Sequence, residues 1–142
     1  GAYGRVSPFL EARMSKQIIH TDAAPAAVGP YSQAVAVPAS GKTVYLSGQI
    51  GLIPATGQLE TGSFEAQVRQ AFANMEAVVR QAGGTLDQVV KLTLFLTDLS
   101  KFGTANDIMA QLIPQPFPAR STVGVAALPK GAEFEVEAIL VI

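Results

Sequence analysis

Hydrophobic residues recur every three to four positions between residues 64 and 82, the spacing that places them on one face of an α-helix. Ser63 stands just before this stretch, where its side chain can cap the first turn, and Gly83 and Gly84 follow it, where glycine ends a helix. We interpret the apolar face as part of the core rather than as a cofactor site. Its members are Phe64, Val68, Phe72, Met75, Val79 and Ala82.

A second helix is predicted from about residue 101 to residue 112, with Asp98 or Ser100 as its cap. Asn106 lies at the edge of its apolar face, and two interpretations stay open. It is either a surface residue or a polar contact at a subunit boundary. The apolar face consists of Phe102, Ala105, Ile108, Met109 and Leu112.

Apolar and polar residues alternate in the segments around these helices, which predicts strands. The strands are expected at 16–20, after Ala34 as far as Val37, and at 43–50, 89–97, 120–126 and 133–139. The order βββαβαββ predicts an α+β fold with a mixed sheet of about six strands and two helices on one face. The opposite face mixes Thr, Glu, Tyr, Phe and Ile, which predicts contact with other subunits.

Arg120 follows Pro116-Phe117-Pro118, which favours an extended backbone at the start of a strand. A guanidinium held there can bind a carboxylate through two parallel hydrogen bonds, although an ion pair with a strand glutamate is the open alternative. If 120–126 and 133–139 form a hairpin, Arg120 lies near Ile139 and Glu135 near Gly124. The two side chains are then roughly 13 Å apart, so a site that uses both needs Arg120 of one chain and Glu135 of a neighbour.

Tyr31 and Gly48 are further candidates with two readings each. Tyr31 follows Gly29-Pro30 at the start of a strand, where its phenol can donate a hydrogen bond or its ring can simply pack. Gly48 lies inside a strand, which indicates either close approach by a ligand or another chain, or a β-bulge. His20 is predicted to be exposed and inert.

The composition narrows the possible functions. Only 15% of the 142 residues are charged and 49% are hydrophobic, which favours oligomerisation. The chain has no cysteine, one histidine and a net charge of −1, which excludes thiol catalysis and disulfides and argues against a nucleic-acid partner. No apolar run is long enough for a membrane span, and we expect a cytoplasmic protein. We interpret residues 1–13 as a leader or upstream extension and residues 14–142 as one domain.

Five motifs, in this order, resemble the RidA (YjgF) family, the reactive-intermediate deaminases. They are Gly29-Pro30-Tyr31-Ser32-Gln33-Ala34, Leu46-Ser47-Gly48-Gln49-Ile50, Val90-Lys91-Leu92-Thr93 with Thr97-Asp98-Leu99, Phe117-Pro118-Ala119-Arg120-Ser121, and Glu135-Val136-Glu137-Ala138. The resemblance covers Met14 to Ile142. It implies an α+β fold like that of the Bacillus-type chorismate mutase, a homotrimer, and ligand sites between subunits.

The resemblance also implies an activity, the hydrolysis of 2-imino acids such as 2-iminobutanoate and 2-iminopropanoate to 2-keto acids and ammonia, without a cofactor or a metal. By position, Arg120 matches the family's carboxylate-binding arginine and Glu135 the glutamate that positions water. Tyr31, Ser47, Gly48 and Asn106 match cleft positions. Thr122 stands where many members have cysteine, and that position is expected to act through its backbone.

Other functions stay open beside this one. A non-enzymatic or RNA-directed role, as translation inhibitor, ribonuclease or chaperone, is attached to some family members. A paralogue with a different small carboxylate ligand is equally compatible with the arginine. Chorismate mutase activity needs several cations, whereas residues 14–142 contain only Arg69, Arg80 and Arg120 as arginines.

Overall fold

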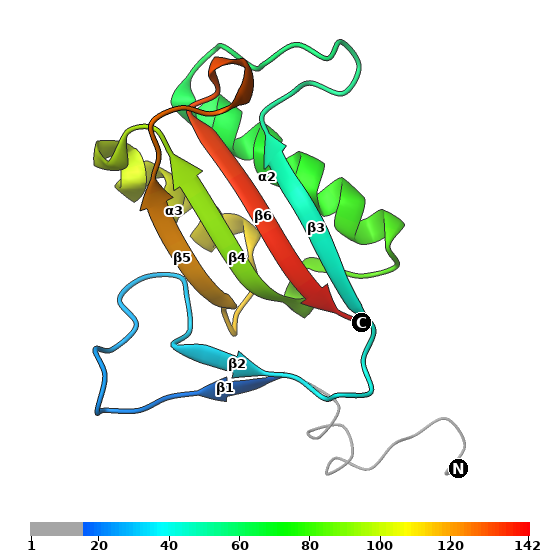
Figure 1. The fold of residues 1–142 in the computed structure, drawn as a ribbon, viewed down its shortest axis with the longest axis vertical. Helices are drawn as coiled ribbons and strands as arrows, with labels where there is room; N and C mark the ends of the chain where they lie inside the picture. Colours follow the sequence, from blue (N-terminus) through cyan, green and yellow to red (C-terminus); the bar gives the residue numbers. More distant parts are fainter. Residues whose placement is uncertain (1–15) are drawn as a thin grey trace.

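The alternating segments form six strands in the computed structural model, which describes residues 16–142 (Figure 1). Four strands make a mixed sheet in the order β3-β6-β4-β5, and the other two pair with each other beyond its lower end. The α+β class and the element order are confirmed, although the six strands are divided between two sheets. The predicted leader, residues 1–13, lies outside the described residues. The strands are β1 (Gln17–Ile19), β2 (Ala34–Ala36), β3 (Thr43–Ile50), β4 (Val89–Leu96), β5 (Ala119–Gly124) and β6 (Phe134–Val141).

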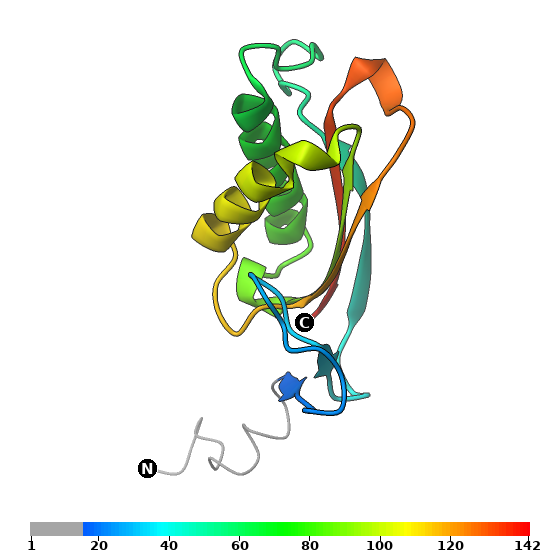
Figure 2. The same ribbon diagram turned by 90° about the vertical axis from the view of Figure 1, so that its left-hand side faces the viewer.

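Two helices, α2 (Phe64–Gln81) and α3 (Phe102–Leu112), cover one face of the four-stranded sheet and leave the other face bare (Figure 2). The Ser63 hydroxyl accepts a hydrogen bond from the Ala66 amide, as expected of the predicted cap. Asp98 caps a short 3-10 turn, η2 (Leu99–Lys101), which leads directly into α3. Two more 3-10 turns, η1 (Leu86–Gln88) and η3 (Pro129–Gly131), precede β4 and β6.

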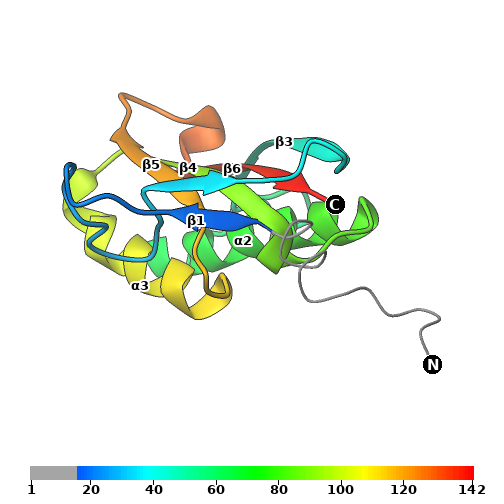
Figure 3. The same ribbon diagram turned by 90° about the horizontal axis from the view of Figure 1, so that it is seen from below.

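The core lies between the helices and the sheet. Alternate residues of β4 and β6 point into it, which is why Leu92, Leu94 and Leu96 are fully buried while their neighbours are not. Phe134 at the start of β6 contacts Phe72 of α2, with ring centroids 5.7 Å apart. Seen from below, both helices lie on the same side of the sheet (Figure 3). Neither helix among residues 16–142 is long and apolar enough to cross a membrane.

The predicted hairpin between the last two strands is wrong. β4 lies between β5 and β6, pairing parallel to β5 and antiparallel to β6. The physical reason is that α3 returns the chain across the sheet and places β5 beside β4, while residues 125–133 form a connection too long for a tight turn. The predicted separation of Arg120 and Glu135 nevertheless survives, because Leu92 of β4 pairs with Arg120 and Phe95 pairs with Glu135.

Candidate functional site

The loop that carries Tyr31 is fastened to the start of β5. The Ser32 amide donates to the carbonyl of Pro118 at 2.9 Å, and the Ser32 hydroxyl donates to the carbonyl of Phe117. Gln33 closes the loop on itself, since its side chain accepts from the Thr21 amide and donates to the carbonyl of Pro25, both at 2.7 Å. These bonds bring Tyr31 beside Arg120, although the two residues are far apart in the sequence.

Arg120 projects from β5 toward α3 and is surrounded by four side chains. Its Nη1 donates to Oδ1 of Asn106 at 2.6 Å and lies 3.6 Å from Sδ of Met109. Its Cζ lies 4.9 Å from the centre of the Tyr31 ring and 5.4 Å from the centre of the Phe102 ring. We call Arg120, Asn106, Met109, Tyr31 and Phe102 the arginine cluster.

Gly29 allows the loop to approach this cluster. Its φ of +114° is a conformation that other residues rarely adopt. A Cβ at this position would also lie 3.2 Å from Nδ2 of Asn106 and 3.8 Å from Nη2 of Arg120. Glycine therefore permits both the turn and the contact.

The guanidinium of Arg120 is half-buried and forms no salt bridge with any described residue. The predicted alternative, an ion pair with a strand glutamate, is therefore absent from residues 16–142. The pKa of Arg120 is lowered overall, because the effect of burial exceeds the opposite effect of the nearby Tyr31. An arginine nevertheless remains charged at neutral pH. A partly desolvated cation without a carboxylate is unfavourable until an anion binds it.

The hydrogen bonds of Arg120 leave one edge of the guanidinium free. Both contacts to α3 use Nη1, whereas Nε and Nη2 have no hydrogen-bond partner among the described residues. Nε–H and Nη2–H point in parallel, the arrangement that matches the two oxygens of a carboxylate. The free edge can therefore accept one carboxylate side-on.

Glu135 lies on β6, on the face of the sheet that the helices do not cover. Its side chain passes over Gly48 of β3, where an added Cβ would lie only 2.6 Å from Oε2 of Glu135. The pairing of β3 with β6 is irregular between Leu46 and Gln49, so the bulge that was one reading of Gly48 is confirmed. We call Glu135, Gly48 and the exposed Ser47 the glutamate cluster.

The two clusters do not meet within one chain. Arg120 pairs with Leu92, whose side chain faces the helices, while Glu135 pairs with Phe95, which points the other way. Three positions along the strands and two strand spacings separate the two backbones, about 14 Å in all. The two charged groups therefore lie at different positions along the strands and on opposite faces of the sheet.

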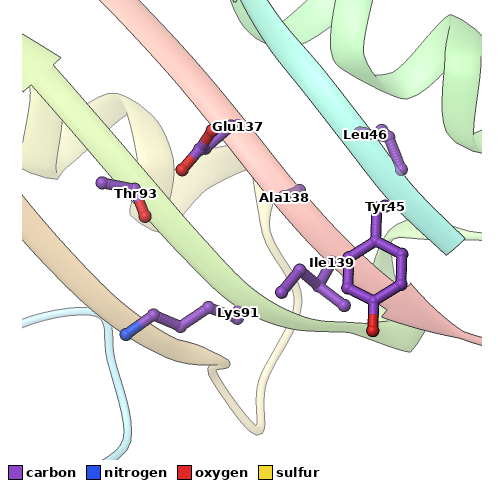
Figure 4. Close-up of a pocket in the computed structure, with 7 residues that line it drawn as sticks. All are labelled: Tyr45, Leu46, Lys91, Thr93, Glu137, Ala138 and Ile139. Atoms are coloured by element: carbon purple, nitrogen blue, oxygen red, sulfur yellow. The ribbon is translucent and has the colours of Figure 1, made fainter. Parts of the chain in front are cut away.

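The bare face also contains a hollow of about 190 Å³ over β3, β4 and β6 (Figure 4). Tyr45, which lines it from the edge strand β3, is 76% exposed. Lys91 points toward β5, away from Glu137, and neither forms a salt bridge with a described residue. Uncovered aromatic and apolar surface is typical of a surface that contacts another chain.

The remaining candidates have definite positions. The Tyr31 hydroxyl accepts from the Val28 amide at 3.2 Å, while its ring faces Arg120. The Thr122 hydroxyl is buried without a partner among the described residues, two positions after Arg120 on the same face. His20 is exposed, as predicted, and its Nε2 lies 3.0 Å from Oδ1 of Asp22. Residues 16–142 bring together no cluster of three or more His, Asp or Glu side chains that could hold a metal ion.

Three contributors were not predicted: Ser32, Phe102 and Met109. Phe102 and Met109 were assigned to the core face of a helix, and Met109 is indeed buried. The signal that could have identified Phe102 is its spacing, because it lies four residues before Asn106 and therefore on the same side of the helix. Ser32 gives no such signal, since its partners come from a distant segment.

Comparisons with known proteins agree on one family. A family described as Endoribonuclease L-PSP matches residues 21–142. A protein of Dermatophagoides farinae named 2-iminobutanoate/2-iminopropanoate deaminase is 50% identical over 127 residues, covering 89% of this chain and 97% of that protein.

Solved structures give the same picture. The crystal structure of RidA from the Antarctic bacterium Psychrobacter sp. is 52% identical, with a TM-score of 0.70 over 89% of this chain and 99% of that one. The crystal structure of TdcF from E. coli, solved with bound serine, is 37% identical, with a TM-score of 0.65 over 89% and 98% of the two chains.

Proposed function

We propose that the chain hydrolyses 2-imino acids to 2-keto acids and ammonia. The premise is its family: the chain belongs to the Endoribonuclease L-PSP family, which includes the RidA (YjgF) proteins. The observation that carries this proposal is the half-buried, unpaired guanidinium of Arg120 with a free side-on edge. Such a group selects small carboxylates. The names of the similar proteins specify the imine, with 2-iminobutanoate and 2-iminopropanoate as substrates.

The site is completed between subunits of a homotrimer in this proposal. Arg120 of one protomer and Glu135 of the next would face the same ligand, since within one chain they lie on opposite sheet faces. The bare face, with the exposed Tyr45 and the unpaired Lys91 and Glu137, supports assembly through this surface.

The chemistry assigned to these residues is a simple hydrolysis. Nε–H and Nη2–H of Arg120 bind the substrate carboxylate and fix the C=N bond, and much of the benefit is orientation. Glu135 accepts a hydrogen bond from a water molecule, which attacks C2 and opens the C=N bond to a tetrahedral amino alcohol. A proton passes to the nitrogen, the C–N bond breaks, and ammonia and the 2-keto acid leave.

The other site residues have supporting roles in this proposal. Tyr31 covers one face of the guanidinium, and Asn106 holds Nη1. Gly48 lies beside Glu135, Ser47 precedes Gly48 in β3, and both would line the same cleft. Because the Thr122 hydroxyl is buried, Thr122 would contact the intermediate through its backbone, which is why threonine can replace the cysteine that many family members have here.

The test is ammonia release from freshly generated 2-iminobutanoate, measured against the uncatalysed reaction. Arg120→Ala should abolish the acceleration. Arg120→Lys keeps the charge but loses the paired donors, so it should raise KM by about tenfold or more. An Arg120→Ala protein with the wild-type rate would contradict the proposal.

The family description also raises ribonuclease activity as a second candidate. The net charge of −1 and the single, exposed His20 give it little support. Incubation with RNA at low and high salt separates the two, because cleavage or salt-sensitive binding at micromolar protein would favour the ribonuclease.

Retained Arg120-dependent activity on a different small carboxylate, with none on 2-iminobutanoate, would indicate a paralogue instead.

A further inference from the structure

Phe102 lies at the first position of α3 and turns its ring toward Arg120 rather than into the core. Phe102, Asn106 and Met109 occupy one side of α3 at helical spacing, and all three contact the guanidinium. The Phe102 ring is half-buried, with its centre 5.4 Å from Cζ of Arg120. Nothing in the reaction described above requires this ring.

The geometry of the arginine cluster gives the ring a physical role. The negative face of an aromatic ring attracts a cation, and the attraction is stronger where water is excluded. Cζ of Arg120 lies over both rings, 4.9 Å from the centre of Tyr31 and 5.4 Å from that of Phe102, while Asn106 binds Nη1. A guanidinium pinned at one corner can still tilt, and a ring on it opposes that motion.

We propose that Phe102 is a positioning residue, which holds the guanidinium of Arg120 so that its Nε–Nη2 edge faces the ligand carboxylate. The inference rests on the proposed function, since it concerns how the anchor for that carboxylate is oriented. Phe102 does not touch the substrate in this proposal. Its effect reaches the ligand only through Arg120.

A purely structural role for Phe102 predicts different results, and the chain offers a matched control. Phe64 lies under another cation, with Lys101 Nζ 5.2 Å from its ring centre, and has no contact with Arg120. Phe102→Leu and Phe64→Leu therefore remove the same ring from a cation and keep an apolar side chain of similar size. Leucine also suits a helix at least as well as phenylalanine. Phe102→Tyr restores the ring.

The experiment measures kcat and KM for imine hydrolysis, together with the affinity for the product 2-oxobutanoate. Phe102→Leu should raise KM and weaken product binding by about tenfold, the upper part of the range for a desolvated cation and ring. The value of kcat should fall less than about threefold, because the catalytic glutamate is untouched. Phe64→Leu and Phe102→Tyr should stay near the wild type. If Phe102→Leu does not fold, Phe102→Met makes the same test.

A second measurement reports on the guanidinium itself. The Nε–Hε resonance of Arg120 in a ¹⁵N-labelled protein, assigned by its loss in Arg120→Lys, senses the ring current of its neighbours. Phe102→Leu should move it toward the position of an exposed arginine, and Phe64→Leu should not.

The results separate this inference from the proposed function. Wild-type KM, product affinity and Arg120 resonance in Phe102→Leu would overturn the positioning role, while an inactive Arg120→Ala would leave the deaminase proposal intact. An Arg120→Ala enzyme with wild-type activity would overturn both.

Discussion

The arginine cluster and the glutamate cluster differ in how their charged groups are held. Arg120 donates a hydrogen bond to an asparagine side chain and contacts a methionine sulfur and two aromatic rings, all within one protomer. The carboxylate of Glu135 has no hydrogen-bond or salt-bridge partner among the described residues and passes over the backbone of Gly48. One charged group is fixed by side chains, and the other only by the space that a glycine leaves.

This difference suggests a division of labour. Because the groups that contact the arginine belong to its own chain, it can bind and align a carboxylate at little further entropic cost. In the proposed trimer, the glutamate would gain its remaining partners from the neighbouring protomer and the ligand. Binding should therefore depend on contacts within the chain, whereas turnover should depend on contacts between chains.

The largest expected effect comes from separating the two clusters into different chains. Arg120→Ala and Glu135→Gln should each lose activity by about a hundredfold or more when produced alone. When the two variants are produced together in equal amounts and assemble at random into trimers, about a quarter of all sites should combine an intact arginine with an intact glutamate. The measurement is ammonia release from 2-iminobutanoate by the mixed trimers.

A site built within one chain gives no recovery in that experiment, because neither variant contains both groups. Wild-type chains mixed with the Arg120→Ala/Glu135→Gln double variant provide the control. They should retain about a quarter of the activity for a shared site and about half for a site within one chain. Activity near half in the control and none in the mixed variants would exclude the shared site.

A smaller effect is expected from displacing Glu135 alone. Gly48→Ala places a methyl group 2.6 Å from Oε2 and 2.9 Å from Cδ of Glu135, so the flexible carboxylate must move while the backbone need not. We expect kcat to fall by about tenfold to a hundredfold, with KM and the unfolding midpoint little changed. Steady-state kinetics and thermal unfolding test this.

Gly103→Ala is the matched control for Gly48→Ala, because a Cβ at Gly103 meets no atom within 4 Å. It lies in α3, where alanine favours the helix, so stability should rise slightly and the kinetics stay unchanged. A Gly48→Ala enzyme with normal kcat would mean that Glu135 need not occupy its observed position.

The elements that were predictable are those with local signals. Ser63, the apolar face of α2 and the glycines after it define that helix within a residue or two, and β3 matches its predicted bounds. The pairing of β5 with β4 has no local signal, because it depends on the path of α3 across the sheet. A hairpin was the simplest reading of two strands that follow each other, and it was wrong.

The candidate site shows the same limit. Arg120, Tyr31 and Asn106 were identified from motifs, and the structure brings them together. Ser32, which fastens the loop to β5, and the ring contact of Phe102 depend on distant segments meeting. Sequence patterns report on the faces of elements, whereas these contacts form at the ends of elements, where side chains from several segments converge.

The smallest effect is expected at the ion pair between Lys101, just before α3, and Glu133, just before β6. Lys101 precedes Phe102 of the arginine cluster, and Glu133 lies two residues before Glu135, with Nζ and Oε1 2.6 Å apart. The hydrogen bond with Glu133 raises the pKa of Lys101 above the ordinary lysine value of 10.5. Because the pKa is higher in the folded state, the stabilisation is fully present below the ordinary value of 10.5. It is lost as the pH rises through the raised pKa of the folded state.

Lys101→Met should therefore lower the free energy of unfolding slightly at neutral pH. It should also make the decrease of that free energy between neutral and strongly alkaline pH smaller than in the wild type. Urea unfolding between pH 7 and pH 11.5 measures both effects, with Lys42→Met as the control, since Lys42 is exposed and forms no salt bridge with a described residue. Activity at neutral pH should stay near the wild type, because each cluster keeps its own contacts. A fall in kcat comparable to that of Gly48→Ala would show instead that the two clusters depend on this pair for their alignment.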